Sequence, residues 1–177
     1  MVGALFVVFT VYNWVQFRPG VREPMAIYDV ALVALGFGLY GLCRRISLSF
    51  MGLHVAAAVL SFAVLGNILL AALYRSNPLF SFYVAVLLIA SAGSVLSIFW
   101  AATIAAVELA AWAIVAAIVL DGSDLTLNAF VMVSSVAVAV IVHVGRYRSR
   151  LRIVELRAGD ARRELALQEA LSEADEA

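Results

Sequence analysis

Residues 79–120 read LFSFYVAVLLIASAGSVLSIFWAATIAAVELAAWAIVAAIVL, an apolar stretch of 42 residues whose only charge is Glu108. As a single helix this stretch would be about 63 Å long, roughly twice the thickness of the hydrocarbon core of a bilayer. It must therefore fold back on itself, and the small and hydroxyl residues at 91–97 mark the turn. The stretch predicts two membrane-spanning helices, at about 79–96 and 98–120.

The composition of the whole chain agrees with a membrane protein. Hydrophobic residues make up 65% of the 177 residues, charged residues only 14%, and the mean hydropathy is +1.04. Soluble domains carry about 25% charged residues, and a water-soluble fold of this length cannot bury so much apolar surface. The composition argues against a soluble enzyme, and the lack of a basic patch argues against a nucleic-acid partner. The lipid bilayer is the predicted partner.

The same reasoning, extended outward from 79–120, gives about six spans in an all-α bundle. The other predicted spans are 2–17, 26–43, 50–74 and 125–144. Breaks are predicted at 18–20, 23–24, 44–45, 75–78 and in the turn 121–124. Residues 1–145 thus form a predicted transmembrane domain.

Charge divides the chain into two parts. Residues 1–145 hold five Arg and five acidic residues, whereas residues 146–177 hold seven of each. The second part is a predicted cytoplasmic helix, and the Arg distribution orients the bundle. Arg44, Arg45, Arg146, Arg148, Arg150 and Arg152 are predicted inside, against Arg18, Arg22 and Arg75 outside. We expect a multi-pass membrane protein with a cytoplasmic C-terminus.

The charged helix contains the seam of a predicted dimeric coiled coil. Its positions follow the spacing 3, 4, 3, 4: Leu151, Val154, Ala158, Ala161 and Leu165. Beyond Leu165 the apolar residues shift out of phase, which allows two competing registers. The alternative is a solvated helix that trails alone from the membrane. Residues 165–177 read as a helix without a C-terminal cap, so we expect the chain to be a fragment of a longer protein.

The last nine residues, EALSEADEA at 169–177, resemble the linker that precedes the phosphoacceptor helix of bacterial sensor histidine kinases, hybrid ones especially. The combination of a multi-span bundle and such a helix is equally similar to membrane-bound diguanylate cyclases and six-span class III adenylyl cyclases. The resemblance implies a homodimeric receptor in a two-component or cyclic-nucleotide system. A kinase or cyclase domain would follow, with a response regulator as a further partner. The catalytic motifs of these families are absent from the 177 residues, so no catalytic residue is assigned.

Glu108 is the most informative residue in the predicted bundle, because ionisable groups within a span are costly and usually face its interior. A protonated Glu108 that is hydrogen-bonded to Asn67, Thr103 or a serine is one interpretation. A role in sensing a ligand or a proton is the other. We also consider an outer pocket for a small signal molecule, lined by Asp29, Asn67 and Asn13 together with Tyr12 and Trp14.

His54 and His143 both lie toward the cytoplasmic side of the predicted bundle, where they can be neighbours. Two histidines on facing helices can ligate haem or a metal ion. Neither has a further ligand at a suitable spacing, so we expect packing roles, with no metal and no cofactor. Gly36, Gly38, Gly41 and Gly66 are predicted sites of close helix approach.

Three functions are therefore weighed. The first is the membrane input module of a signalling receptor, most readily a sensor histidine kinase, with a cyclase as the alternative output. The second is a small transporter that uses Glu108 as its coupling group, although the two halves show no internal repeat. The third is an electron carrier that uses the two histidines.

Overall fold

The computed structural model describes residues 11, 14–15, 18–75, 79–95 and 97–175, with side chains for all of these except 75 and 165–175. Their regular structure is entirely helical, with no strand in the described ranges. The helices are α2 (Arg22–Arg45), α3 (Phe50–Arg75), α4 (Phe80–Ser94), α5 (Ile98–Val119) and α6 (Gly122–Asp175). The all-α prediction is confirmed.

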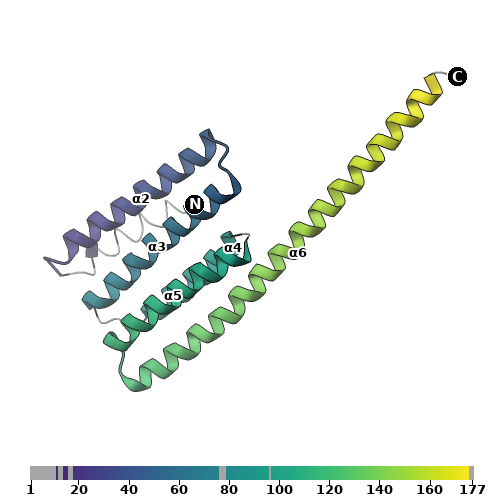
Figure 1. Cartoon of the computed structure of the whole chain (residues 1–177). Coiled ribbons are helices and arrows are strands. Elements are labelled where there is room, and N and C mark those ends of the chain that lie inside the picture. The colour runs from purple at the N-terminus through teal and green to yellow at the C-terminus, as the bar shows by residue number, and fades with distance from the viewer. Residues whose placement is uncertain (1–10, 12–13, 16–17, 76–78, 96, 176–177) are drawn as a thin grey trace.

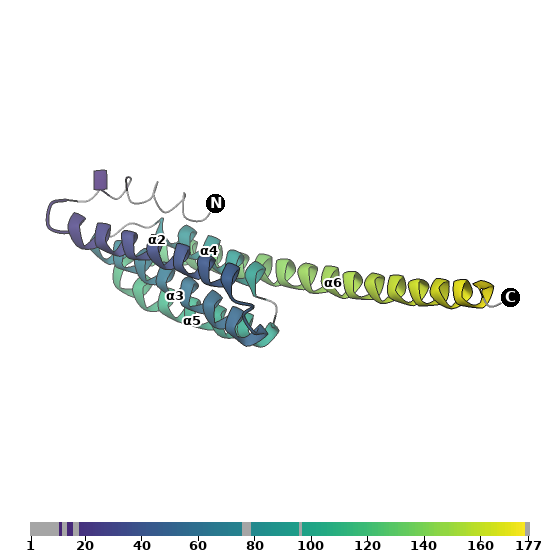
Figure 2. The same ribbon diagram turned by 90° about the horizontal axis from the view of Figure 1, so that it is seen from above.

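Four of these helices are long and apolar enough to cross a membrane: α2, α3, α5 and α6, the last over Gly122–Glu164. Helices α4 and α5 lie against the first part of α6, with α3 and then α2 beyond them. The remainder of α6 projects from the bundle (Figures 1 and 2). We call the end from which α6 projects the exit end. It also holds the α2–α3 connection at 46–49 and the α4–α5 connection at 95–97.

Helix α4 has only 15 residues, about 22 Å, which is shorter than the hydrocarbon core. It packs against α3, α5 and above all α6. Seven of its residues are buried, including Phe80, Val84 and Leu88. Other helices thus cover one face of α4, which lies at the centre of the contacts, while Phe82 and Val86 on its other face stay exposed.

The largest buried cluster joins α4 to its three neighbours. It includes Leu65 of α3, Phe80 and Val84 of α4, Trp112 of α5 and Met132 of α6. Between helices in lipid, such contacts stabilise through close packing, because the lipid tails are as apolar as the side chains.

Two predicted breaks prove to be helix starts. Helix α2 begins at Arg22, so Pro24 lies within its first turn, where a missing N–H removes no helical hydrogen bond. Helix α6 begins at Gly122 and includes Asp124 in its first turn, where a carboxylate is favoured by the helix dipole. The predicted break at 23–24 and most of the predicted turn at 121–124 are therefore wrong. The turn before α2 is made by Gly20, whose φ is +95°.

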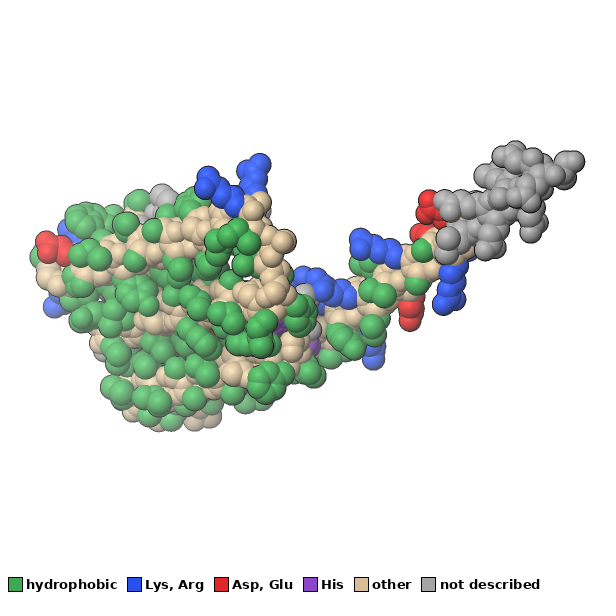
Figure 3. Space-filling model, turned by 45° about the horizontal axis from the view of Figure 1, so that its top comes forward, with side chains coloured by type: hydrophobic (Ala, Val, Ile, Leu, Met, Phe, Trp, Pro, Cys, Tyr) green, Lys and Arg blue, Asp and Glu red, His purple; other side chains and the backbone are tan. Residues whose placement is uncertain are grey.

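The surface of the bundle is mostly apolar, and its charges gather at the ends and along the projecting part of α6 (Figure 3). Exposed large side chains include Ile27, Phe37, Val86, Ile114 and Phe130. An apolar surface of this extent suits lipid rather than water, which indicates a membrane protein.

The number of membrane crossings stays a prediction. The expected first span, 2–17, lies almost wholly outside the described residues, and the expected fourth is the short α4. The close-approach prediction is confirmed for Gly66. An added Cβ at Gly36, Gly38 or Gly41 would meet no atom of the described residues within 4 Å, so close approach at these three stays a prediction.

Candidate functional site

The interior of the bundle holds a set of buried polar side chains, which are the candidates for function in a membrane domain. Those described are Asp29, His54, Ser61, Ser81, Ser91, Glu108, Asn128, Ser135 and His143. Asp29 belongs to an α2–α3 pair, and Asn128 and Ser135 donate to carbonyls of their own helix, α6. The other groups are a central α4–α5 group, with Ser81, Ser91 and Glu108, and an exit-end group, with His54 and His143.

The central group contains Glu108 of α5, which has no exposed surface. Its Oε2 atom lies 3.3 Å from the hydroxyl of Ser91, which donates to it, while its Oε1 atom has no described hydrogen-bond partner. Of the partners considered for Glu108, which were Asn67, Thr103 and a serine, the structure thus places a serine beside it. Asn67 instead pairs with Asp29, and the Thr103 hydroxyl donates to the carbonyl of Phe99 at 2.9 Å.

The hydrogen-bond geometry around Ser91 suits an uncharged Glu108. The Ser91 hydroxyl also lies 3.1 Å from the Leu88 carbonyl, yet it has only one proton to donate. When that proton goes to Leu88, a protonated Glu108 can donate to the Ser91 oxygen. No ion pair compensates Glu108 among the described side chains, so its neutral form is the one that its surroundings satisfy.

The α2–α3 pair joins two predicted site residues. The Asn67 amide donates to Asp29 Oδ1 at 2.7 Å, and Asp29 is only 1% exposed. Beside them, the Tyr28 hydroxyl donates to the Ala63 carbonyl at 3.0 Å. Gly66 makes room for this tyrosine, since a Cβ there would lie 2.6 Å from the Tyr28 oxygen. The pair closes the α2–α3 contact, while Asn13, the third predicted pocket residue, lies outside the described residues.

One buried bond was missed by the sequence reasoning. The Trp112 indole N–H donates to the Ser81 hydroxyl at 2.8 Å, and both residues are buried. A tryptophan in the middle of a span, away from the interfacial belt, needs a partner for its N–H. The need of the Trp112 N–H for a partner was therefore the feature of the sequence that could have revealed this bond.

The two histidines contact the backbone on either side of the α4–α5 turn in sequence, at the last turn of α4 and just before α5. His54 of α3 accepts the Ser97 N–H at its Nε2 atom, 3.1 Å away, and its Nδ1 atom faces the Phe50 carbonyl at 2.6 Å. His143 of α6 places Nδ1 3.2 Å from the Ala92 carbonyl. Because an Nδ1 that faces a carbonyl carries the proton, both rings serve as backbone clamps.

These contacts bear on the possible metal or haem site. No cluster of three or more His, Cys, Asp or Glu side chains suited to a metal occurs in the part of the chain that the structure describes. His54 already uses both ring nitrogens on backbone atoms. It would have to give up one of these bonds to become a ligand.

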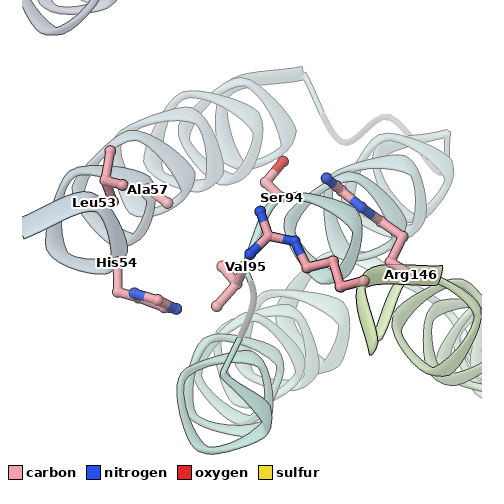
Figure 4. Close-up of a pocket in the computed structure, with 7 residues that line it drawn as sticks. Leu53, His54, Ala57, Ser94, Val95 and Arg146 are labelled. Carbon is pink, nitrogen blue, oxygen red and sulfur yellow. The ribbon is translucent and has the colours of Figure 1, made fainter. Parts of the chain in front are cut away.

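A cavity of about 230 Å³ opens at the exit end, beside His54. Figure 4 shows residues of α3, of the α4 C-terminus and of α6 around it. The lining residues are Leu53, His54, Ala57, Ser94, Val95, Arg146 and Arg150. Sequence reasoning used these two arginines only to orient the bundle in the membrane and did not place them at a cavity.

The predicted coiled-coil seam lies on the projecting part of α6. Its described side chains are all exposed, with Leu151 at 47% and Val154 at 64%. The side chain of Leu165 lies outside the described set. The seam is therefore open to a partner along the described part of its length.

Comparison of the chain with protein-family models, with curated proteins and with solved structures gives no match. The function is therefore argued from the geometry alone.

Proposed function

We propose that this chain is the membrane input module of a bacterial signalling receptor, most readily a sensor histidine kinase. It takes a cue within the bundle and passes it through α6, as a homodimer, to an output domain on the cytoplasmic side. A diguanylate or adenylyl cyclase is the alternative output, because the combination of a multi-span bundle and such a helix is equally similar to those receptors.

The observation that carries this proposal is the continuity of α6. Its 54 residues run without a break from Gly122 at the edge of the bundle to Asp175 in the charged segment, a length of about 80 Å. Such a helix transmits a shift or rotation of the part packed on the bundle to its projecting part, because it moves as a rigid element.

The buried face of α6 is placed to receive such a shift. It presents Asn128, Met132, Ser135, Ala139 and His143 to the bundle, at helical spacings of 3 and 4. Its main contact is α4, which carries Ser91 and so the hydrogen bond to Glu108. A change at Glu108 therefore reaches α6 through α4.

The exposed face of α6 supports a dimer. The seam's alternating spacing of 3 and 4 residues continues toward the N-terminus of α6. It runs there through exposed apolar side chains: Phe130, Val133, Ala137, Val140, Val144 and Tyr147. One uninterrupted stripe thus joins the predicted membrane part to the predicted coiled coil, as a two-helix interface that starts in the membrane requires.

The charges beside the seam indicate that the projecting part alone pairs weakly. In a parallel dimer, Arg150 would face Glu155 of the second copy, which is attractive. Arg157 would face Arg162 of the second copy, which is repulsive. The membrane part of the stripe or the output domain must then hold the dimer together, so that the register of the cytoplasmic part can change.

A transporter is the second candidate, and the unpartnered Oε1 atom of Glu108 is the observation that favours it. Proton-coupled uptake that is lost in Glu108→Gln would support this function over the receptor.

The experiment that tests the receptor proposal is to read the coding frame of the gene downstream of Ala177. A phosphoacceptor-histidine helix followed by an ATP-binding domain is expected, and a nucleotide cyclase domain would keep the receptor and change its output. A stop codon directly after Ala177 would contradict the proposal.

A further inference from the structure

The exit-end cavity combines an apolar floor with two cationic side chains. Leu53, Ala57 and Val95 supply the apolar lining, and Arg146 and Arg150 supply the charge. The two arginines are four residues apart on α6, so they lie on the same face one turn from each other.

No described side chain of the same copy neutralises either arginine. No ion pair joins Arg146 or Arg150 to a carboxylate whose side chain the structure describes, and no acidic residue stands three or four positions from either along α6. The other polar lining groups already use their donors within the chain, since the Ser94 hydroxyl donates to the Ala90 carbonyl and His54 Nδ1 faces the Phe50 carbonyl. The guanidinium groups are thus the donors left for a ligand, which must be an anion.

The surroundings identify the kind of anion. The cavity lies where the apolar part of α6 gives way to its charged part, the position of a membrane–water boundary in the proposed topology. Leu53 is 44% exposed at its edge, which leaves an apolar path from the cavity to the lipid. A ligand with an anionic head and an apolar tail fits both features.

We propose that this cavity binds the headgroup of an anionic phospholipid, with its phosphodiester held by Arg146 and Arg150. Basic pockets between helices on the cytoplasmic side of membrane proteins suit such headgroups. Arginine also matches a phosphate group with paired N–H donors. The proposal requires only that the bundle lies in a bilayer, so it stands or falls separately from the receptor function.

A lipid bound here would connect helices that otherwise do not touch. The cavity is lined by α3, by the end of α4 and by α6, whereas α3 and α6 do not pack on each other in the described chain. The bound headgroup would therefore couple the base of the projecting helix to α3, and the anionic lipid content of the membrane would influence the position of α6.

The test measures lipid binding to the whole chain in mild detergent by native mass spectrometry. The protein is titrated with phosphatidylglycerol, or with phosphatidylcholine of the same acyl chains. The variant is Arg146→Gln with Arg150→Gln. The control is Arg44→Gln with Arg45→Gln, which removes the same charge at the same end of the bundle from residues that do not line the cavity.

We expect one tightly bound phosphatidylglycerol that phosphatidylcholine does not replace. The cavity variant should weaken its binding about 30-fold, because each basic residue near an anionic lipid contributes about five-fold. The control should lose less than about three-fold, since screening limits the effect of distant charges. Substitution of both cavity arginines by lysine should keep most of the binding, which separates loss of charge from a folding defect.

Three results would overturn the proposal. The first is an equal loss in the cavity variant and the control, and the second is equal affinity for the two lipids. The third is displacement of phosphatidylglycerol by millimolar inorganic phosphate, which would make the cavity a site for a free anion. In a dimer, Glu155 of the second copy competes with the lipid for Arg150. The single variant Arg146→Gln should therefore still bind phosphatidylglycerol about five-fold more weakly than the unaltered chain.

Discussion

Gly66 offers a sharp test of the helix packing, because it lies directly against the hydroxyl of Tyr28. In Gly66→Ala the new Cβ would stand 2.6 Å from the Tyr28 oxygen, whereas real Cβ contacts are essentially never shorter than 3.0 Å. The tyrosine must therefore move by at least 0.4 Å, away from a hydrogen bond of 3.0 Å to the Ala63 carbonyl.

The cost follows from these two effects. Loss of the hydrogen bond costs about 1 kcal/mol, and overpacking of a close contact costs about 1–3 kcal/mol. We expect Gly66→Ala to lose about 2–4 kcal/mol of stability. For a chain of this size, that loss lowers the melting temperature by about 4–16 °C.

The double variant isolates the contact. Tyr28→Phe removes the oxygen and leaves the ring carbon Cζ 3.6 Å from the new Cβ, an ordinary contact. Tyr28→Phe alone should cost about 1 kcal/mol. Adding Gly66→Ala to it should cost nothing more, so the coupling equals the whole cost of Gly66→Ala, about 2–4 kcal/mol. Gly38→Ala is the control, because a Cβ there meets no atom within 4 Å.

The assay is the apparent melting temperature of the purified protein in detergent, followed by the loss of monodisperse protein on size-exclusion chromatography. The reasoning is refuted if Gly66→Ala has the same apparent melting temperature as the Gly38→Ala control. It is also refuted if adding Tyr28→Phe does not remove the extra destabilisation caused by Gly66→Ala. Either result would mean that α2 and α3 do not meet as described.

Two further predictions concern the buried polar groups. Glu108→Gln should change the apparent melting temperature by less than about 2 °C, because the amide keeps the size and neutrality of a protonated carboxyl. Glu108→Ala should cost about 2–3 kcal/mol for the lost packing, and equal losses in both variants would contradict an uncharged Glu108. His54→Phe should speed hydrogen exchange at the Ser97 amide about five- to ten-fold, since it removes the acceptor of that bond. Unchanged exchange in mass spectrometry of the 95–97 peptide would refute the clamp.

Sequence reasoning located most of the helices because their ends are marked chemically. The helix predicted at 50–74 is found at Phe50–Arg75 and that at 98–120 at Ile98–Val119, since charges or small residues bound these apolar runs. It failed at the N-termini of α2 and α6. There proline, glycine and aspartate are compatible with a first helical turn as well as with a break.

The sequence was enough to name the polar residues of the candidate site but not their hydrogen-bond partners. Burial of Glu108 follows from its position in an apolar helix, whereas the choice among Asn67, Thr103 and a serine depends on the helix faces that meet. The pairing of Asn67 with Asp29 and the use of both histidines as backbone clamps depend on the same tertiary contacts. The exit-end cavity joins residues nearly 100 positions apart, such as Leu53 and Arg150, which no local pattern reveals.

The interface along α6 is open to direct measurement by disulfide cross-linking. Single cysteines are placed in a Cys43→Ala background, because Cys43 is an exposed free thiol. Two seam positions, Leu151 and Val154, are compared with Ile153 and Leu156, which are equally apolar and exposed but lie off the seam. Cross-links form only where the Cα atoms of two copies approach within about 7 Å.

The central claim is that two copies of α6 pair along one stripe, from the bundle into the projecting helix. Oxidation of native membranes that contain these variants is therefore the most direct test. We predict dimers at Leu151→Cys, Val154→Cys and, within the bundle, Val140→Cys, and little product at Ile153→Cys or Leu156→Cys. Equal cross-linking at all positions, or none at any, would contradict a dimeric signalling helix.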